Sequence, residues 1–152
     1  MVFLKFIRLN DSPQRISLGF GLGVFLGILP GTGPVAALIL AALFRVNRAA
    51  ALLGSLLTNT WLSIATIVLS IKLGSVIMNK NWVDVYAQWQ LFLSQFQWRN
   101  IREAAFLQTA ASVALGYLLI GFLCAAGSYL LLLIAFTLRK KYENKNRTDV
   151  PL

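Results

Sequence analysis

Two long uncharged runs constrain this chain more than any other feature of its sequence. Asp, Glu, Lys and Arg are all missing over 49–71 and over 104–138, which are 23 and 35 residues long. A helix that crosses a bilayer needs about 20 apolar residues, so each run is long enough to cross. Charged residues make up only 12% of the chain, about half the share of a soluble domain. The sequence therefore predicts an all-α integral membrane protein.

A shorter apolar stretch near the N-terminus combines evenly spaced glycines with a helix break. Gly19, Gly23 and Gly27 lie four positions apart, on one helical face that another helix backbone can approach closely. The break that follows consists of Pro30, Gly31, Thr32, Gly33 and Pro34. Its freed backbone groups must be satisfied by protein or by trapped water. The apolar part before the break, 16–29, is about 21 Å long as a helix, shorter than the ~30 Å bilayer core.

The stretch is thus either a short re-entrant helical hairpin over 12–46 or one kinked span. The distribution of basic residues distinguishes these two topologies. A re-entrant hairpin leaves ten Lys and Arg on one side and four on the other, whereas a single span leaves seven on each. Because basic residues concentrate in the cytoplasm, we expect the hairpin, with both termini cytoplasmic. The net charge is +9, and we expect its basic residues to contact membrane lipids and not nucleic acid. The predicted headgroup anchors are Arg15, Arg45, Arg48, Arg139, Lys140 and Lys141.

The rest of the chain supplies about two full transmembrane helices and one interfacial amphipathic helix. We expect a single membrane domain over 1–138 and a basic, disordered cytoplasmic tail over 139–152. Aromatic residues recur every three or four positions between 82 and 96, which is typical of a helix in the headgroup zone. After the hairpin, the predicted segments are a transmembrane helix over 48–78 capped by Asn47, an external interfacial segment over 79–102 and a transmembrane helix over 103–138.

The residue inventory argues against catalysis. The chain has no histidine and a single cysteine, Cys124, which lies inside an apolar run. The acidic residues all lie outside the apolar spans. A membrane hydrolase needs a nucleophile with a base, or metal ligands. We therefore expect no enzyme activity, no metal and no cofactor. Proton relays also use intramembrane carboxylates or histidine, so the lack of these residues argues against proton-coupled transport.

A polar site is nevertheless possible at the break. Half-helix ends that oppose each other at mid-depth form substrate sites in several transporters without charged side chains. The candidate substrate-binding residues are Gly31, Thr32 and Gly33 at the break, with Thr58, Asn59 and Thr60 in the following helix. The alternative is a closed structural contact, in which Asn59 hydrogen-bonds the carbonyls that the break frees.

One sequence motif resembles that of a known family. The residues are Ser12-Pro13-x-Arg15-Ile16-Ser17-x-Gly19-Phe20-Gly21-x-Gly23-Val24-Phe25-x-Gly27-x-x-Pro30, then Gly33 and Arg45-Val46-Asn47. They resemble the bacterial membrane proteins called domain of unknown function twenty-sixty-two, over about 12–74. The family has an Asn-Pro in its next helix, whereas here Asn59 precedes Thr60. The resemblance implies a multi-pass bacterial inner-membrane protein. Fusion of some relatives to glycosyltransferase domains points to envelope chemistry.

Two classes of function therefore stay open. One is a small transporter or channel-like subunit with its site at the hairpin break, working as a homo-oligomer because so few spans cannot enclose a path alone. Its glycine face would meet another subunit, or Ser112 and Gly116. The other is a non-catalytic assembly or scaffold protein that positions a membrane-protein partner or lipid for cell-envelope biosynthesis.

Overall fold

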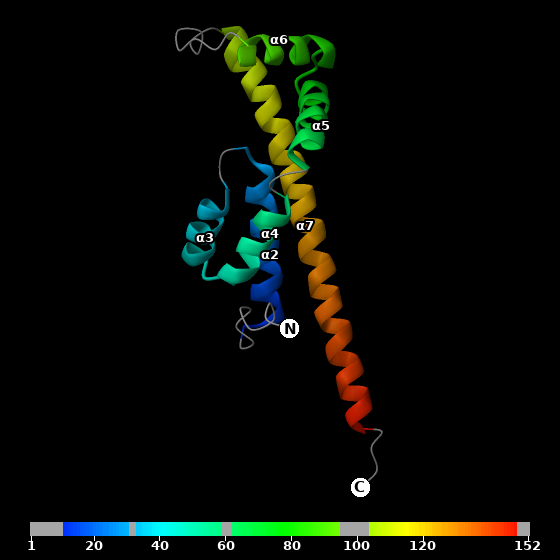
Figure 1. Cartoon of the computed structure of the whole chain (residues 1–152). Helices are drawn as coiled ribbons and strands as arrows, with labels where there is room; N and C mark the ends of the chain where they lie inside the picture. The colour runs from blue at the N-terminus through cyan, green and yellow to red at the C-terminus, as the bar shows by residue number, and fades with distance from the viewer. Residues whose placement is uncertain (1–10, 31–32, 59–61, 95–103, 149–152) are drawn as a thin grey trace. The chain divides into compact units, whose positions relative to one another are not determined.

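The structure is a computed structural model that describes residues 11–30, 33–58, 62–94 and 104–148. The described residues form only helices: α2 (Pro13–Ile28), α3 (Gly33–Leu43), α4 (Arg48–Thr58), α5 (Leu62–Ile77), α6 (Trp82–Ser94) and α7 (Ala104–Thr148) (Figure 1). The all-helical part of the predicted fold class is confirmed. Two compact units divide the chain. One holds α2, α3, α4 and α7 from Leu123 onward; the other holds α5, α6 and α7 up to Phe122.

The first helix of the first unit, α2, begins where a capping residue precedes a proline. Ser12 has extended backbone, and its hydroxyl accepts a hydrogen bond from the Arg15 N–H at 3.4 Å. Pro13 occupies the first turn, where a missing N–H costs no intrahelical bond. The helix ends at Ile28, and Leu29 is extended because the following Pro30 disfavours helical backbone in the residue before it. Local sequence therefore fixes both ends of α2.

The next helix, α3, brings the chain back to the end where α2 began, and α4 starts from there. The backbone N–H of Asn47 donates to the carbonyl of Arg15 at 3.2 Å, so α4 begins beside the first turn of α2. The intervening helix, α3, buries Ala37 and Ala41, which lie four positions apart on one face. Small alanines on that face let α3 approach its neighbours, and Figure 1 shows α2, α3 and α4 as one helical group. Whether this hairpin re-enters a membrane stays a prediction.

A tight backbone contact joins α2 to α4. Its pairs are Gly19 with Asn47, Gly23 with Ala51, and Gly27 with Ser55. The residue numbers rise together on both helices, so α2 and α4 run parallel. A Cβ built on Gly23 would lie only 2.0 Å from the Ala51 carbonyl oxygen, which leaves no room for any side chain. We call this contact the glycine seam; it follows the i, i+4 rows of both helices.

The glycine seam corrects the predicted partner of the glycine face. We expected another subunit, or Ser112 and Gly116, but the glycines contact α4 of the same unit. The reason is that α4 also carries small residues on the facing row, and its Gly54 would place a Cβ 2.4 Å from the Phe20 carbonyl oxygen. Two rows of small residues, one on each helix, allow a closer approach than one row alone.

The segment predicted as one transmembrane helix over 48–78 contains two helices, α4 and α5. They are separated by 59–61, which lie outside the described residues. At the end of α4 the Thr58 hydroxyl donates to the carbonyls of Gly54 at 2.9 Å and Ser55 at 3.3 Å. Such bonds from a threonine hydroxyl to the carbonyls three and four residues earlier keep the side chain within its own helix.

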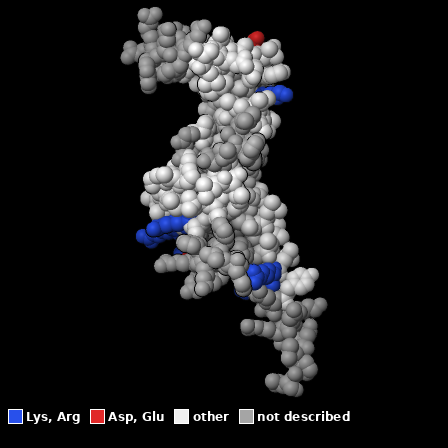
Figure 2. Space-filling view, in the orientation of Figure 1, with Lys and Arg blue, Asp and Glu red and all other residues white. Residues whose placement is uncertain are grey.

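Helix α7 is the longest element of the chain. Its residues Ala104–Tyr142 are long and apolar enough to cross a membrane, and no other helix among the described residues meets that test. On the face shown in Figure 2, Lys, Arg, Asp and Glu occupy only a few small patches of the described surface. The tail over 139–152, predicted to be disordered, is helical up to Thr148. Lys, Arg and Glu are good helix formers, and extending an existing helix needs no new nucleus.

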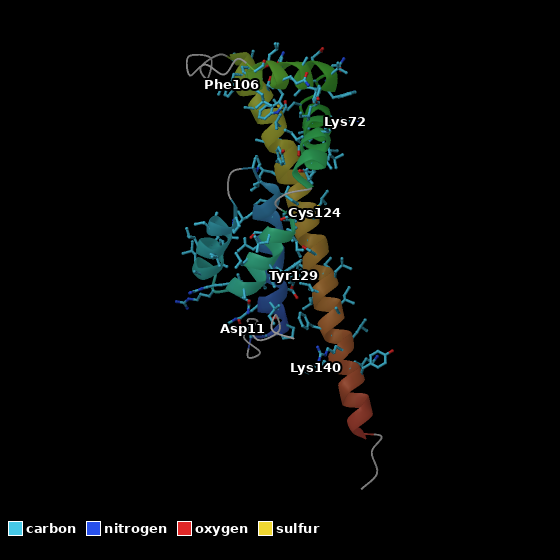
Figure 3. All side chains as sticks on the ribbon, viewed as in Figure 1. Asp11, Lys72, Phe106, Cys124, Tyr129 and Lys140 are labelled. Atoms are coloured by element: carbon cyan, nitrogen blue, oxygen red, sulfur yellow. The ribbon has the colours of Figure 1, made fainter. Side chains whose placement is uncertain are left out.

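The second unit is a helical pair with α6 lying across its end (Figure 1). Helices α5 and α7 run antiparallel through close contacts of Gly74 with Ser112 and of Gly116 with Ser70. Asn81 caps α6, its side chain accepting from the Val83 N–H at 3.0 Å. Two contacts join α6, the predicted amphipathic helix, to its neighbours. The rings of Phe92 and Phe106 meet edge to face with centroids 4.7 Å apart, and the Lys72 ammonium lies 4.9 Å from the centroid of the Trp82 ring. Figure 3 labels Lys72 and Phe106.

Candidate functional site

The best-defined polar site of the first unit is built around Asn47. This side chain is buried, and it caps α4 by accepting a hydrogen bond from the Ala50 N–H at 2.8 Å. Its amide nitrogen donates to Asp11 Oδ2 at 2.7 Å. Asn47 thereby ties the residue before α2 to the first turn of α4, although Asp11 and Asn47 are 36 positions apart. The predicted capping role of Asn47 is confirmed.

Two residues before the cap, Arg45 adopts a backbone conformation that arginine normally avoids. Its φ is 54°, in the left-handed region. The N–H groups of Arg45 and Val46 bond back to the carbonyls of Ala42 and Ala41, at 3.3 and 3.0 Å. These bonds form a Schellman motif, in which glycine or asparagine normally takes the left-handed place. The end of α5 has the same pattern with Asn79 there, at φ 53°. Arginine in this conformation costs about 1–2 kcal/mol.

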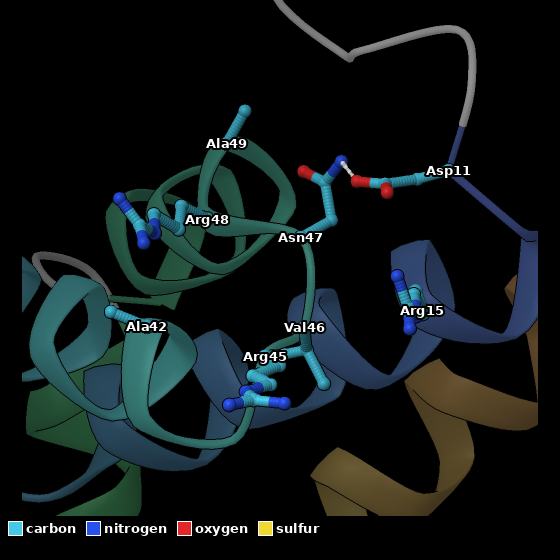
Figure 4. Close-up of a pocket in the computed structure, with 8 residues that line it drawn as sticks. All are labelled: Asp11, Arg15, Ala42, Arg45, Val46, Asn47, Arg48 and Ala49. Carbon is cyan, nitrogen blue, oxygen red and sulfur yellow. Dashed lines mark hydrogen bonds between the residues drawn. The ribbon is translucent and has the colours of Figure 1, made fainter.

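These residues surround an open pocket of about 530 Å³, shown in Figure 4. Three arginines line it, each from a different element: Arg15 from α2, Arg45 from the α3–α4 connection and Arg48 from the first turn of α4. The one carboxylate in its lining is Asp11, which is already bonded to Asn47. The lining is completed by Ala42, Val46 and Ala49. We call this site the arginine pocket; three cations against one anion give it a net charge of +2.

Three of the predicted headgroup anchors therefore converge on one site, and three do not. Arg139, Lys140 and Lys141 are exposed on α7 and do not line the arginine pocket. Sequence analysis identified the pocket arginines only as separate anchors. It missed Asp11 as a member of the site. The available signal was that Asp11 and Asn47 each precede a helix start, which placed both at the same end of the hairpin.

Most of the predicted substrate-binding residues are outside the structure's described residues. Gly31, Thr32, Asn59 and Thr60 all fall there. Gly33 starts α3 with a φ of +59° and open space around it. The Thr58 hydroxyl is committed to its own helix, and a Cβ on Gly27 would clash with it. Of the helix-break residues, Pro30 follows α2 and Pro34 lies in the first turn of α3. The structure does not bring Thr58 and Gly33 together in one described pocket.

Metal-ligating side chains are sparse in the described part of the chain. Within the ranges that the structure describes, no group of three or more His, Cys, Asp or Glu is placed to hold a metal ion. Cys124 is a half-buried free thiol on α7 (Figure 3). The arginine pocket has a different composition: arginine side chains form paired hydrogen bonds with phosphate and carboxylate groups, so its charged lining is chemically suited to an anion.

Comparison with known proteins gives one match. A family model described as an uncharacterized protein conserved in bacteria, DUF2062, matches residues 1–145. No curated protein and no solved structure matches the chain.

Proposed function

Because the chain belongs to the DUF2062 family of uncharacterized bacterial proteins, which assigns no activity, we propose a function from its own residues. The proposal is a non-catalytic scaffold of the bacterial inner membrane, multi-pass and with both termini cytoplasmic, that holds a membrane-protein partner for envelope biosynthesis. The observation that carries it is the glycine seam. Backbone of α4 fills the space beside Gly23, where a transport path along this face would need room.

Gly127 of α7 supports the presence of a surface for a protein partner. Most helical glycines whose surroundings the structure describes are pressed against another backbone, but Gly127 has nothing within 4 Å and lies on an exposed part of α7. Glycine inside a helix costs about 1 kcal/mol relative to alanine, so an open glycine there needs a reason. Leu123 and Leu131 flank it at four-residue spacing and are 59% and 72% exposed. A small residue between two exposed leucines suits the close approach of another helix.

The test places a photo-crosslinking benzophenone amino acid at Leu131 in native membranes. The scaffold proposal expects a discrete protein product on the gel, either with a second copy of this chain or with a different protein. Gly127→Ile should remove that product without unfolding the chain, because the new side chain enters open space. The matched control carries the same probe at Val76, an equally exposed residue of α5. If Leu131 gives no more product than Val76, the proposed scaffold function is wrong.

A transporter or channel-like subunit is the second candidate. It is favoured by the open space around Gly33, a residue of the helix break. In a Cys124→Ala background, Thr32→Cys should then react with a membrane-impermeant thiol reagent from one side, with Arg48→Cys and Asn79→Cys as reference positions. Labelling of Thr32→Cys would favour transport over the scaffold. Protection from both sides, with the reference positions reacting, would favour the scaffold.

A further inference from the structure

We propose that the arginine pocket binds the phosphate group of an anionic lipid whose acyl chain lies along the exposed face of α3. This site is separate from the surface around Gly127 and does not depend on the scaffold function.

The charges favour a phosphate. Arg15, Arg45 and Arg48 reach the pocket from three elements, and the guanidinium fork matches phosphate oxygens with paired hydrogen bonds. Asp11 reduces the attraction but does not cancel it. A volume of about 530 Å³ lies within the ~300–1,000 Å³ usual for small-molecule sites, so a headgroup larger than phosphate alone can enter.

Buried residues and main-chain hydrogen bonds fix the backbone around the pocket, which distinguishes it from scattered surface arginines. Asn47 is only 4% exposed and links Asp11 to the first turn of α4. Its carbonyl oxygen is also where Gly19 of the glycine seam makes contact. The main chain at Arg45 is fixed by two hydrogen bonds to the last turn of α3. The two main-chain segments that carry Arg45 and Arg48 are therefore positioned before any ligand arrives.

An uncovered apolar stripe leads to the pocket. Val35, Ile39 and Leu43 lie four positions apart on α3 and are 69%, 62% and 71% exposed, while Ala37 and Ala41 on the other face are fully buried. Phe44, also exposed, directly precedes Arg45. A stripe of bulky apolar side chains that ends at a cluster of arginines has the amphipathic pattern of a lipid, an acyl chain joined to a phosphate. This continuity favours a lipid over a free phosphate as the source of the ligand.

Isothermal titration of the full chain in a non-ionic detergent tests the proposal with three probes: dioctanoyl phosphatidylglycerol, dioctanoyl phosphatidylcholine and inorganic phosphate. We expect phosphatidylglycerol to bind most tightly. Arg15→Gln, Arg45→Gln and Arg48→Gln should each weaken its binding about tenfold, or ~1.4 kcal/mol. Lys72→Gln, which removes an exposed cation of α5 that neither lines the pocket nor belongs to the predicted headgroup anchors, should leave the affinity unchanged.

Two further variants identify the ligand and guard against misfolding. Ile39→Ser should weaken lipid binding and leave phosphate binding unchanged. Asp11→Asn keeps an oxygen for Asn47 and removes the opposing charge, so binding should become about threefold tighter. Arginine variants that bind phosphatidylglycerol like the unmodified chain would overturn the site. Equal affinity for inorganic phosphate, with no effect of Ile39→Ser, would overturn the lipid assignment in favour of a free phosphate.

Discussion

Replacing Gly23 by alanine should force α2 and α4 apart. The added Cβ would lie 2.0 Å from the carbonyl oxygen of Ala51, and real Cβ atoms essentially never approach closer than 3.0 Å. The two backbones must therefore separate by about 1 Å, the difference between these distances. Because the atoms contacted are main-chain atoms of Ala51, no side-chain rotation can relieve the clash.

The cost of this separation follows from the seam. A gap of ~1 Å forfeits about half of each dispersion contact along two helices, and overpacking of this kind costs about 1–3 kcal/mol. The cost should lie at the upper end, since the clash is with backbone. Alanine recovers ~1 kcal/mol of helix propensity. We therefore expect Gly23→Ala to lower the free energy of unfolding by about 2 kcal/mol.

Gly127→Ala is the matched control, because it is the same substitution inside a helix with nothing within 4 Å. It should raise the unfolding free energy of the purified chain by up to ~1 kcal/mol through helix propensity alone. Both values come from denaturant titration of the detergent-solubilised protein, followed by far-ultraviolet circular dichroism. If Gly23→Ala proves as stable as Gly127→Ala, the glycine seam does not hold α2 against α4 and the argument fails.

The remaining predictions concern the arginine pocket. Asn47→Asp keeps a capping oxygen but sets a second carboxylate against Asp11, so unfolding free energy should fall by about 1–2 kcal/mol. A double-mutant cycle with Asp11→Asn should recover most of this loss, and additive effects would contradict the Asp11–Asn47 bond. Arg45→Gly suits the left-handed backbone, so it should raise the free energy of unfolding by ~1 kcal/mol. The same variant should weaken phosphatidylglycerol binding in the titration. A fall in both quantities would show that Arg45 is not strained.

Features that depend on a few neighbouring residues were predictable from the sequence. Ser12 with Pro13 marks the start of α2, and Asn47 marks the start of α4, because a cap and its helix are adjacent in the chain. The interfacial helix after Asn79 was expected from its aromatic spacing, and α6 lies there. The extent of the uncharged run likewise predicted the long apolar helix that α7 forms.

Pairing between distant segments was not predictable in the same way. The spacing of Gly19, Gly23 and Gly27 predicts that another helix packs closely on this face. It does not predict which helix, because several other segments also carry small residues. The arginine pocket depends on the same pairing, because its members meet only when α4 lies beside α2. The helical tail was missed for a different reason. Its composition is that of a disordered segment in isolation, but a segment joined to a formed helix does not need to nucleate one.

The glycine seam and the arginine pocket are parts of one arrangement, and Asn47 joins them. Its carbonyl oxygen would lie 2.4 Å from a Cβ on Gly19, while its side chain bonds Asp11 and caps α4. The closeness of the two helices at Gly19 therefore sets where Arg48 and the first turn of α4 stand relative to Arg15. A larger residue at position 19 would widen the seam and move one wall of the pocket with it. The glycine at this end of α2 is needed for the geometry of a charged site as well as for packing.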